Sequence, residues 1–170
     1  MKKGMKYLIV GESGKGKSTL LNILFGNLQP LDGKILIDNK ELSYRQLREI
    51  IFYNSQFSNV FSDNYANNVT LFDSFTIKEE ISLPEKHKNK ILKSDNCSQL
   101  SGGQKQMIKL QRAILSQMPI LLMDEPFSAM NSELEIDLTK KLVQLDKTII
   151  LVSHNTNPDY LNLFDEVIYL

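Results

Sequence analysis

Glycines, lysines and hydroxyl side chains are interleaved in residues 11–19, GESGKGKST. Such glycines let successive backbone N–H groups turn toward an anion without a Cβ clash, and a helix that begins there adds its positive end. The pattern is that of the Walker A phosphate loop, in which Lys17 is expected to reach the β- and γ-phosphates and Ser18 to bind Mg²⁺. The residues predicted to bind these phosphates are Gly11, Ser13, Gly14, Lys15, Gly16, Lys17, Ser18 and Thr19.

A glycine turn beside an incidental lysine would have a similar composition, and the flanking residues disfavour it. Lys6–Val10 is a short apolar run that predicts a buried strand. Ser18–Phe25 has helical periodicity and is followed by Gly26, a favourable helix end. A strand before the glycines and a helix after them are the context that a phosphate loop requires.

Two adjacent acids follow a second apolar run, Ile120–Met123. In this Walker B arrangement Asp124 is expected to hold Mg²⁺ through its water shell, and Glu125 to act as the general base that polarises an attacking water. Two acids at a solvated helix entry are the alternative. The phosphate loop elsewhere in the chain favours the catalytic interpretation.

The chain has two histidines, and only one stands where a ligand would bind. His154 follows the apolar run Thr148–Val152, and the carboxyl ends of strands in a doubly wound sheet form the ligand crevice. Its imidazole is expected to donate to a γ-phosphate, although alone it would be read as a surface residue. His87 lies in a charged run, residues 85–90, and we assign it no role.

The elements that must position these residues alternate between strands and helices. This predicts an α/β fold of the P-loop NTPase class, with a mostly parallel sheet, helices on both faces and a small helical insertion. We expect one domain over residues 1–170, in which 1–55 and 102–170 form the core and about 56–101 the insertion. Strands are predicted at Lys6–Val10, Lys34–Asp38, Glu49–Tyr53, Ile120–Met123, Thr148–Val152 and Val167–Leu170, and helices at Ser18–Phe25, at Gly103–Leu115 and after a capping box, Ser132–Glu135.

Composition excludes several other classes. Lys plus Arg and Asp plus Glu are 20 each, so there is no global basic field and nucleic acid is not an expected partner. The sequence has no run of 18 apolar residues, so no membrane-spanning helix is predicted. The single Cys97 excludes an internal disulfide, which makes a cytoplasmic setting the default.

A second glycine-containing motif, LSGGQ at residues 100–104, resembles the signature of ABC-type ATPases. The five motifs occur in that family's order: Walker A, Gln56 at the Q-loop position, the signature, Walker B and His154. The resemblance implies ATP and Mg²⁺ as cofactors, Gln56 as a metal ligand and γ-phosphate sensor, and head-to-tail pairing with a second ABC ATPase domain, identical or different. The signature residues that would contact the ATP of the partner are Ser101, Gly102, Gly103 and Gln104, and the catalytic residues would be Lys17, Gln56, Glu125 and His154.

The stretch Phe57–Phe72 resembles the exporter pattern, in which an aromatic segment receives a helix of the transmembrane domain. Four of the eight phenylalanines lie between Phe57 and Phe75, and an exposed aromatic cluster there would be a docking surface. Packing of these rings inside the insertion is the alternative. The resemblance thus favours an export ATPase at the inner face of the cell membrane, attached through a transmembrane partner.

Three departures from the family pattern keep other functions open. The chain has one strand before Walker A, where Tyr7 would be a poor substitute for the family's adenine-stacking aromatic; Asn131 replaces an aspartate; and the chain stops soon after His154. We therefore expect a shortened domain. The alternatives are a degenerate or truncated nucleotide-binding module that hydrolyses little ATP alone, and a soluble ABC ATPase outside transport.

Overall fold

The computed structural model describes residues 2–37, 39–74 and 83–170. The chain folds as two compact units, each of which is built from separate segments. The first unit contains residues 1–53, 118–125 and 146–170, and the second contains residues 54–117 and 126–145.

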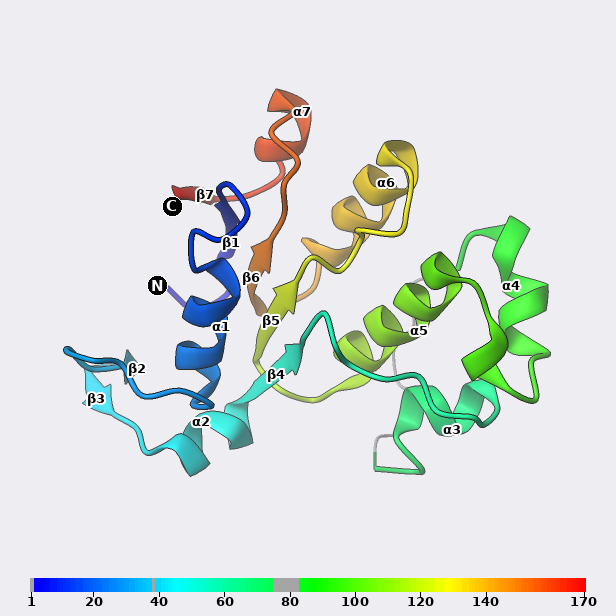
Figure 1. The fold of residues 1–170 in the computed structure, drawn as a ribbon, viewed down its shortest axis with the longest axis horizontal. Helices are drawn as coiled ribbons and strands as arrows, with labels where there is room; N and C mark the ends of the chain where they lie inside the picture. The colour runs from blue at the N-terminus through cyan, green and yellow to red at the C-terminus, as the bar shows by residue number, and fades with distance from the viewer. Residues whose placement is uncertain (1, 38, 75–82) are drawn as a thin grey trace. The chain divides into compact units, whose positions relative to one another are not determined.

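The first unit is built on a five-stranded sheet with the order β4-β5-β6-β1-β7 (Figure 1). Strand β1 runs parallel to both β6 and β7, and β5 runs parallel to β6, with Leu8 opposite Leu151 and Val167. Every residue of β1 and β6 is buried, as strands covered on both faces require. The strands are β1 (Lys6–Val10), β4 (Ile51–Asn54), β5 (Ile120–Asp124), β6 (Thr148–Val152) and β7 (Glu166–Tyr169).

The helices of the first unit are α1 (Lys17–Phe25), α2 (Tyr44–Ile50) and α7 (Pro158–Leu161). Helix α1 ends where Gly26 adopts φ 79°, a left-handed conformation that glycine reaches without strain. Leu21 of α1 and Leu47 of α2 are buried in one cluster with β-strand residues such as Ile9 and Leu122.

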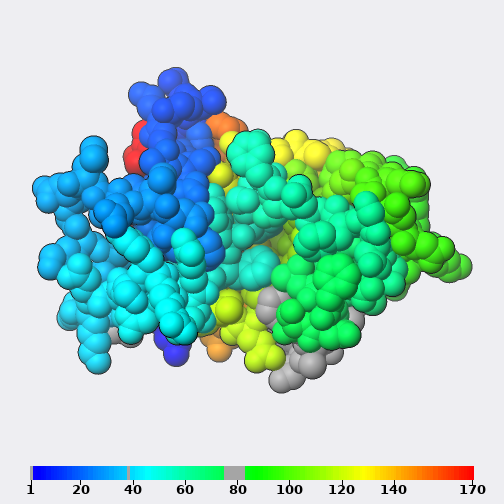
Figure 2. Space-filling model, turned by 60° about the horizontal axis from the view of Figure 1, so that its bottom comes forward, coloured from blue at the N-terminus to red at the C-terminus, as the bar shows by residue number. Residues whose placement is uncertain are grey.

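Two predicted strands of the first unit need correction. Glu49 and Ile50 end helix α2, because a capping box of Ser43 and Gln46 begins a helix there, and the strand starts only at Ile51. The strand predicted at Lys34–Asp38 is limited to β2 (Leu36–Ile37), which pairs antiparallel with β3 (Lys40–Glu41), and Asp38 lies outside the described residues. Residues 27–37 and 39–41 lie on the surface, light blue in Figure 2.

The second unit is helical, with α3 (Tyr65–Thr70), α4 (Glu85–Leu92), α5 (Gly102–Leu115), α6 (Ser132–Leu142) and the 3₁₀ turn Cys97–Gln99. Its core joins Tyr65 and Val69 of α3 to Met107 and Ile108 of α5. The predicted insertion, about residues 56–101, is thus part of a larger unit that includes 102–117 and 126–145. The apolar face of α5 is the reason, since it packs on the insertion helices.

Helix α6 begins differently from its prediction. Asn131 is the N-cap, and its Oδ1 accepts a hydrogen bond from the Leu134 N–H at 3.0 Å. Ser132 is instead the first helical residue, so the predicted capping box from Ser132 to Glu135 is wrong by one position. Asparagine and aspartate cap helices equally well, which means that Asn131 keeps the cap but lacks the charge.

Among the described residues, no helix is long and apolar enough to cross a membrane.

Candidate nucleotide-binding site

The phosphate loop joins the end of β1 to the start of α1 (Figure 1). Gly14 and Gly16 adopt φ 82° and 86°, a left-handed conformation that is strained for other residues. Gly16 is the N-cap of α1, and no described side chain caps this end. The first N–H groups of the helix are therefore available to an anion.

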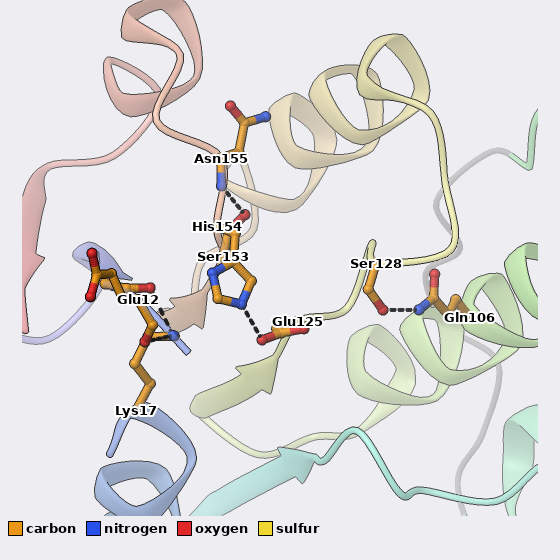
Figure 3. Close-up of polar contacts among 9 residues, drawn as sticks. Glu12, Lys17, Gln106, Glu125, Ser128, Ser153, His154 and Asn155 are labelled. Atoms are coloured by element: carbon orange, nitrogen blue, oxygen red, sulfur yellow. Dashed lines mark hydrogen bonds and ion pairs between the residues drawn. The ribbon is translucent and has the colours of Figure 1, made fainter. Parts of the chain in front are cut away.

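Lys17 is folded onto the loop that precedes it. Its Nζ donates to the carbonyl oxygens of Gly11 and Glu12, both at 2.8 Å (Figure 3). The side chain is buried, so the ammonium is held in place without a phosphate. Two of its three N–H donors are used, which leaves one for a phosphate oxygen.

Gly11 has a second role that its motif did not indicate. A Cβ at this position would lie 2.7 Å from the carbonyl oxygen of Leu170, far inside van der Waals contact. The Leu170 N–H also donates to Val10 O at 3.0 Å. Gly11 is thus required where the chain after β7 passes closely along the phosphate loop.

Asp124 ends strand β5 and is buried. Its Oδ2 lies 3.5 Å from the Tyr53 hydroxyl, whereas its buried Oδ1 has no hydrogen-bond partner among the described residues. Burial, and to a lesser degree the charge of Glu125, raises the pKa of Asp124, and the hydroxyl of Ser18 opposes this. An unsatisfied carboxylate oxygen near a serine hydroxyl fits Mg²⁺, which prefers oxygen ligands. The described residues contain no cluster of three or more His, Cys, Asp or Glu that would hold a metal ion alone.

Tyr53 is a site residue that sequence reasoning missed. Asn22, on α1, donates through Nδ2 to the Tyr53 hydroxyl at 3.3 Å and to Ser18 O at 2.8 Å. Since its oxygen accepts from Asn22, the Tyr53 hydroxyl directs its hydrogen toward Asp124. Its position at the end of β4, beside the predicted Walker B strand, is the signal that could have identified it.

Burial, and then the charge of Asp124, raises the pKa of Tyr53 to about 12. The unfolded chain releases this proton near pH 10, so the contribution of Tyr53 to stability is complete below about pH 10 and is lost as the pH rises to about 12. We expect the melting temperature of the metal-free protein to fall more steeply over this range than that of Tyr53→Phe. Thermal melts in a chelator at several pH values measure it, and parallel profiles for the two proteins would contradict it.

Glu125 and His154 meet at the ends of β5 and β6 (Figure 3). Glu125 Oε1 lies 2.7 Å from His154 Nε2. Glu125 has φ 49°, rare for a residue with a side chain, and its N–H donates to Val152 O at 3.1 Å. Such strained backbone is concentrated at functional sites. The side chains are 23% and 49% exposed, so water reaches the pair.

The signature residues lie in the second unit, at the start of α5. Ser101 and Gln104 form a capping box, in which Ser101 Oγ accepts from the Gln104 N–H at 3.5 Å and Gln104 Oε1 accepts from the Ser101 N–H at 3.2 Å. Ser101 and Gly102 are exposed and Gly103 is half-buried, whereas Gln104 is buried. The exposed start of the helix thus consists of a hydroxyl and two glycines.

Gln56 also lies in the second unit, where it is exposed. Its carbonyl accepts a hydrogen bond from Lys109 Nζ at 3.2 Å. The phosphate loop, Asp124, Glu125 and His154 all belong to the first unit. The predicted site residues are therefore divided between the two units.

The aromatic segment is exposed as a docking surface requires. Phe57 is 86% exposed, and the rings of Phe61 and Phe72 contact each other at a tilt, with centroids 5.5 Å apart, while both remain exposed. Phe75 lies outside the described residues. Tyr7, in contrast, is buried, and its hydroxyl accepts from the Lys2 N–H at 2.6 Å. Tyr7 is thus not placed to stack on an adenine.

A parallel sheet with a phosphate loop after its first strand and two acids at the end of another defines a P-loop nucleoside triphosphatase. Comparison with known proteins specifies the family: the model described as ABC transporter matches residues 1–128. The chain belongs to this family, as one of its ATP-binding ATPase domains.

Curated relatives include both export and import systems. The lactococcin transport/processing ATP-binding protein LcnC-like of Lactococcus lactis subsp. lactis (strain IL1403) is 36% identical over 170 residues, which cover 91% of this chain and 24% of that protein. The thiamine import ATP-binding protein ThiQ of Haemophilus influenzae (strain 86-028NP) is 31% identical over 191 residues, which cover 99% of this chain and 84% of that protein. The chain thus matches most of an import ATPase but only a quarter of a larger transport protein.

Solved structures agree with this assignment. The dimeric post-hydrolysis state of the ATP-binding cassette MJ0796, bound to ADP and Pi, has a TM-score of 0.77 and 31% identity, with 100% of this chain and 82% of that chain covered. A bacterial Atm1-family ABC exporter with ATP bound also has a TM-score of 0.77, at 27% identity, with 99% and 32% covered.

Proposed function

We propose that this chain binds Mg²⁺ and ATP, hydrolyses the ATP within a head-to-tail pair of ABC ATPase domains, and thereby drives export through a transmembrane partner. One observation carries the catalytic part. Glu125 Oε1 lies 2.7 Å from His154 Nε2. The residue before Glu125 in the sequence is Asp124, whose buried Oδ1 has no hydrogen-bond partner among the described residues. The side chains proposed as the base, as the hydrogen-bond donor to the γ-phosphate and as the metal ligand thus lie at the ends of two paired strands, which supports the proposal.

The phosphate loop would bind the nucleotide. The first N–H groups of α1, with the left-handed Gly14 and Gly16, offer donors for phosphate oxygens. Lys17 would keep its contacts with the loop carbonyls and use its remaining donor on the β- and γ-phosphates. Charge on the phosphates is neutralised by this ammonium and by the helix end.

When bound, Mg²⁺ would neutralise negative charge on the β- and γ-phosphates. Asp124 Oδ1 and the Ser18 hydroxyl are the groups of the first unit that would hold it, and Gln56 is the candidate from the second. Asp124 Oδ2 would remain on Tyr53, which fixes the carboxylate plane and turns Oδ1 away.

Glu125 would act as the general base. Its Oε1 accepts the proton of the attacking water, while the oxygen of that water attacks the γ-phosphorus and ADP leaves. His154 holds Glu125 in the resting state through Nε2, and the same nitrogen would donate to the γ-phosphate when ATP arrives. This exchange of partners releases Glu125 for the water.

The signature residues would complete the site of a second domain, identical or different. Ser101, Gly102 and Gly103 present a hydroxyl and backbone N–H groups at the N-terminus of a 14-residue helix, which attracts the γ-phosphate of the partner domain. Gln104 would act by holding Ser101 through the capping box. ATP would therefore favour the closed pair, and loss of the γ-phosphate would release it.

The exposure of the aromatic segment Phe57–Phe72 is the reason for proposing a transmembrane partner and a location at the inner face of the membrane. Export rests on this segment, because relatives named for lactococcin transport and for thiamine import reach the same 36% identity. A photocrosslinking residue at Phe57 in host membranes is expected to capture a transmembrane subunit, and the same residue at exposed Leu31 is the control. Reconstitution of that subunit with the chain, followed by transport in vesicles with ATP only outside, would show the direction. Release from the lumen would contradict export.

Mg-ATP turnover of the purified chain tests the catalytic proposal. We expect Lys17→Met to lower kcat/KM by about a hundredfold or more, since it removes the ammonium that neutralises the phosphates and holds the loop closed. Exposed Lys140→Met on α6 is the matched control. Phosphate release and nucleotide binding are measured in parallel. Binding of ATP by the wild type without any turnover would instead select the degenerate nucleotide-binding module.

A further inference from the structure

Asn22 lies in the interior of helix α1, one turn after Ser18, where it is half-buried. Asparagine is a weak helix former, because its short amide competes with the backbone for hydrogen bonds. Here the amide uses both donors and its acceptor oxygen. Its Nδ2 donates to Ser18 O at 2.8 Å and to the Tyr53 hydroxyl at 3.3 Å. Its Oδ1 accepts from Asn27 Nδ2 at 3.0 Å. These contacts, rather than helix propensity, account for an asparagine at this position.

The two contacts of Nδ2 lead to the two side chains of the first unit that would hold the metal. One contact is to the Ser18 carbonyl, in the same residue as the proposed ligand hydroxyl. The other is to Tyr53, whose hydroxyl lies 3.5 Å from Asp124 Oδ2. Because the phenol oxygen accepts from Asn22, its hydrogen points toward the carboxylate. All four residues belong to the first unit. One amide group thus connects both proposed metal ligands.

The far end of this hydrogen-bonded chain is anchored on helix α2. Arg48 Nη2 donates to Asn27 Oδ1 at 3.2 Å and to Gly26 O at 3.1 Å, where a cation at the end of α1 is favourable. The Arg48 guanidinium carbon also lies 5.8 Å from the centroid of the Phe25 ring. The Phe25 ring contacts that of Tyr53, with centroids 5.4 Å apart. Both the ring and the hydroxyl of Tyr53 are therefore attached to α1, and the end of α1 is attached to α2.

We propose that Asn22 is a positioning residue for the metal site, which holds the Ser18 hydroxyl and Asp124 Oδ1 in the arrangement that receives Mg²⁺. This inference rests on the proposed function, in which these two oxygens hold the metal together with ATP. Without the Asn22 amide, the phenol hydrogen of Tyr53 is no longer directed at Asp124, and the carboxylate loses the partner that sets its plane. Groups that orient metal ligands from outside contribute about tenfold to a hundredfold to metal affinity.

Nucleotide affinity with and without Mg²⁺ tests this role separately from turnover. The probe is a non-hydrolysable ATP analogue, titrated calorimetrically into the intact chain in Mg²⁺ and again in a chelator. We expect Asn22→Leu to reduce the gain in affinity that Mg²⁺ brings by about tenfold or more. The affinity in chelator should change less than about threefold, since the phosphate loop is untouched. A residue needed only for folding would lower both affinities alike.

The choice of variants separates the donor role of Asn22 from its size. Leucine is similar in size and is the better helix former, so Asn22→Leu is expected to fold. Asn22→Asp keeps the shape but replaces the donors by acceptors. Its carboxylate would accept the Tyr53 hydrogen and turn it away from Asp124, so this variant should not restore the gain. Asn89→Leu, at an exposed asparagine within α4, is the matched control.

Tyr53→Phe is the second variant, which keeps the ring and removes the hydroxyl. It should also reduce the Mg²⁺-dependent gain, and the double variant should resemble Asn22→Leu alone, because both changes act on one carboxylate. An unchanged gain in Asn22→Leu that is folded by circular dichroism would overturn the inference and leave the proposed function intact. A wild type that binds the analogue no better with Mg²⁺ would instead overturn the proposed metal site, and the inference with it.

Discussion

Glu125→Gln is expected to abolish turnover while leaving ATP bound. The amide no longer accepts a proton from water, and general-base catalysis contributes about a hundredfold to ten-thousandfold to such reactions. A glutamine oxygen can still accept from His154 Nε2, so the 2.7 Å contact and the local fold are kept. Because hydrolysis is the step that removes the γ-phosphate, the variant should accumulate as an ATP-bound pair of domains.

Two measurements check this expectation. Phosphate release gives the loss of kcat, and size exclusion with Mg-ATP or Mg-ADP shows whether the pair forms only with ATP. Glu133→Gln, an exposed acid in the first turn of α6, is the control for a lost negative charge. Unchanged turnover in Glu125→Gln would remove the residue from the role of base. Lost turnover without any ATP-dependent pairing would contradict the sandwich arrangement only.

Arg112→Met is expected to cause the largest loss of stability, about 3–5 kcal/mol of the free energy of unfolding. Arg112 is 5% exposed, and its guanidinium donates to the carbonyl oxygens of Asn59 and Asn68 and, at 2.7 Å, to Asn68 Oδ1. It also lies 5.0 Å from the Phe61 ring centroid. Burial lowers the pKa of Arg112, and its removal leaves several acceptors unpaired in the segment that carries the exposed aromatic rings.

Urea unfolding followed by circular dichroism measures this loss. Arg45→Met removes an arginine of the exposed pair with Glu49 and should cost less than about 1 kcal/mol. Arg112→Lys should restore only part of the stability, since an ammonium cannot reproduce the planar set of three donors. Equal midpoints for Arg112→Met and Arg45→Met would show that the buried contacts contribute little.

Residues close together in the sequence determined the site motifs. The phosphate loop and Walker B acids were recognised from short patterns because each depends on a strand and the turn directly after it. Glycine, lysine and hydroxyl residues at fixed spacing indicate phosphate binding from a short stretch of sequence alone. The strands β1, β5 and β6 were predicted for the same reason, since a fully buried parallel strand is a continuous apolar run.

Local patterns were also misread where two signals overlapped. The apolar run Glu49–Tyr53 predicts a strand, but the capping box at Ser43 extends a helix through Glu49 and Ile50, and the strand begins at Ile51. At helix α6 the sequence pattern predicts Ser132 as the N-cap, whereas the structure has Asn131, one residue earlier, in this position. Both residue types cap helices, and only the backbone path distinguishes them.

The tertiary structure alone decided which distant residues meet. Tyr53 reaches Asp124 across 71 residues, Gln106 reaches Ser128 across 22, and Gly11 must admit the backbone of Leu170. No periodicity in the sequence encodes such pairs, because they depend on the order of strands in a sheet and on how a loop returns to a helix. The sequence by itself determined the chemistry of this ATPase domain, and the fold decided which residues hold that chemistry in position.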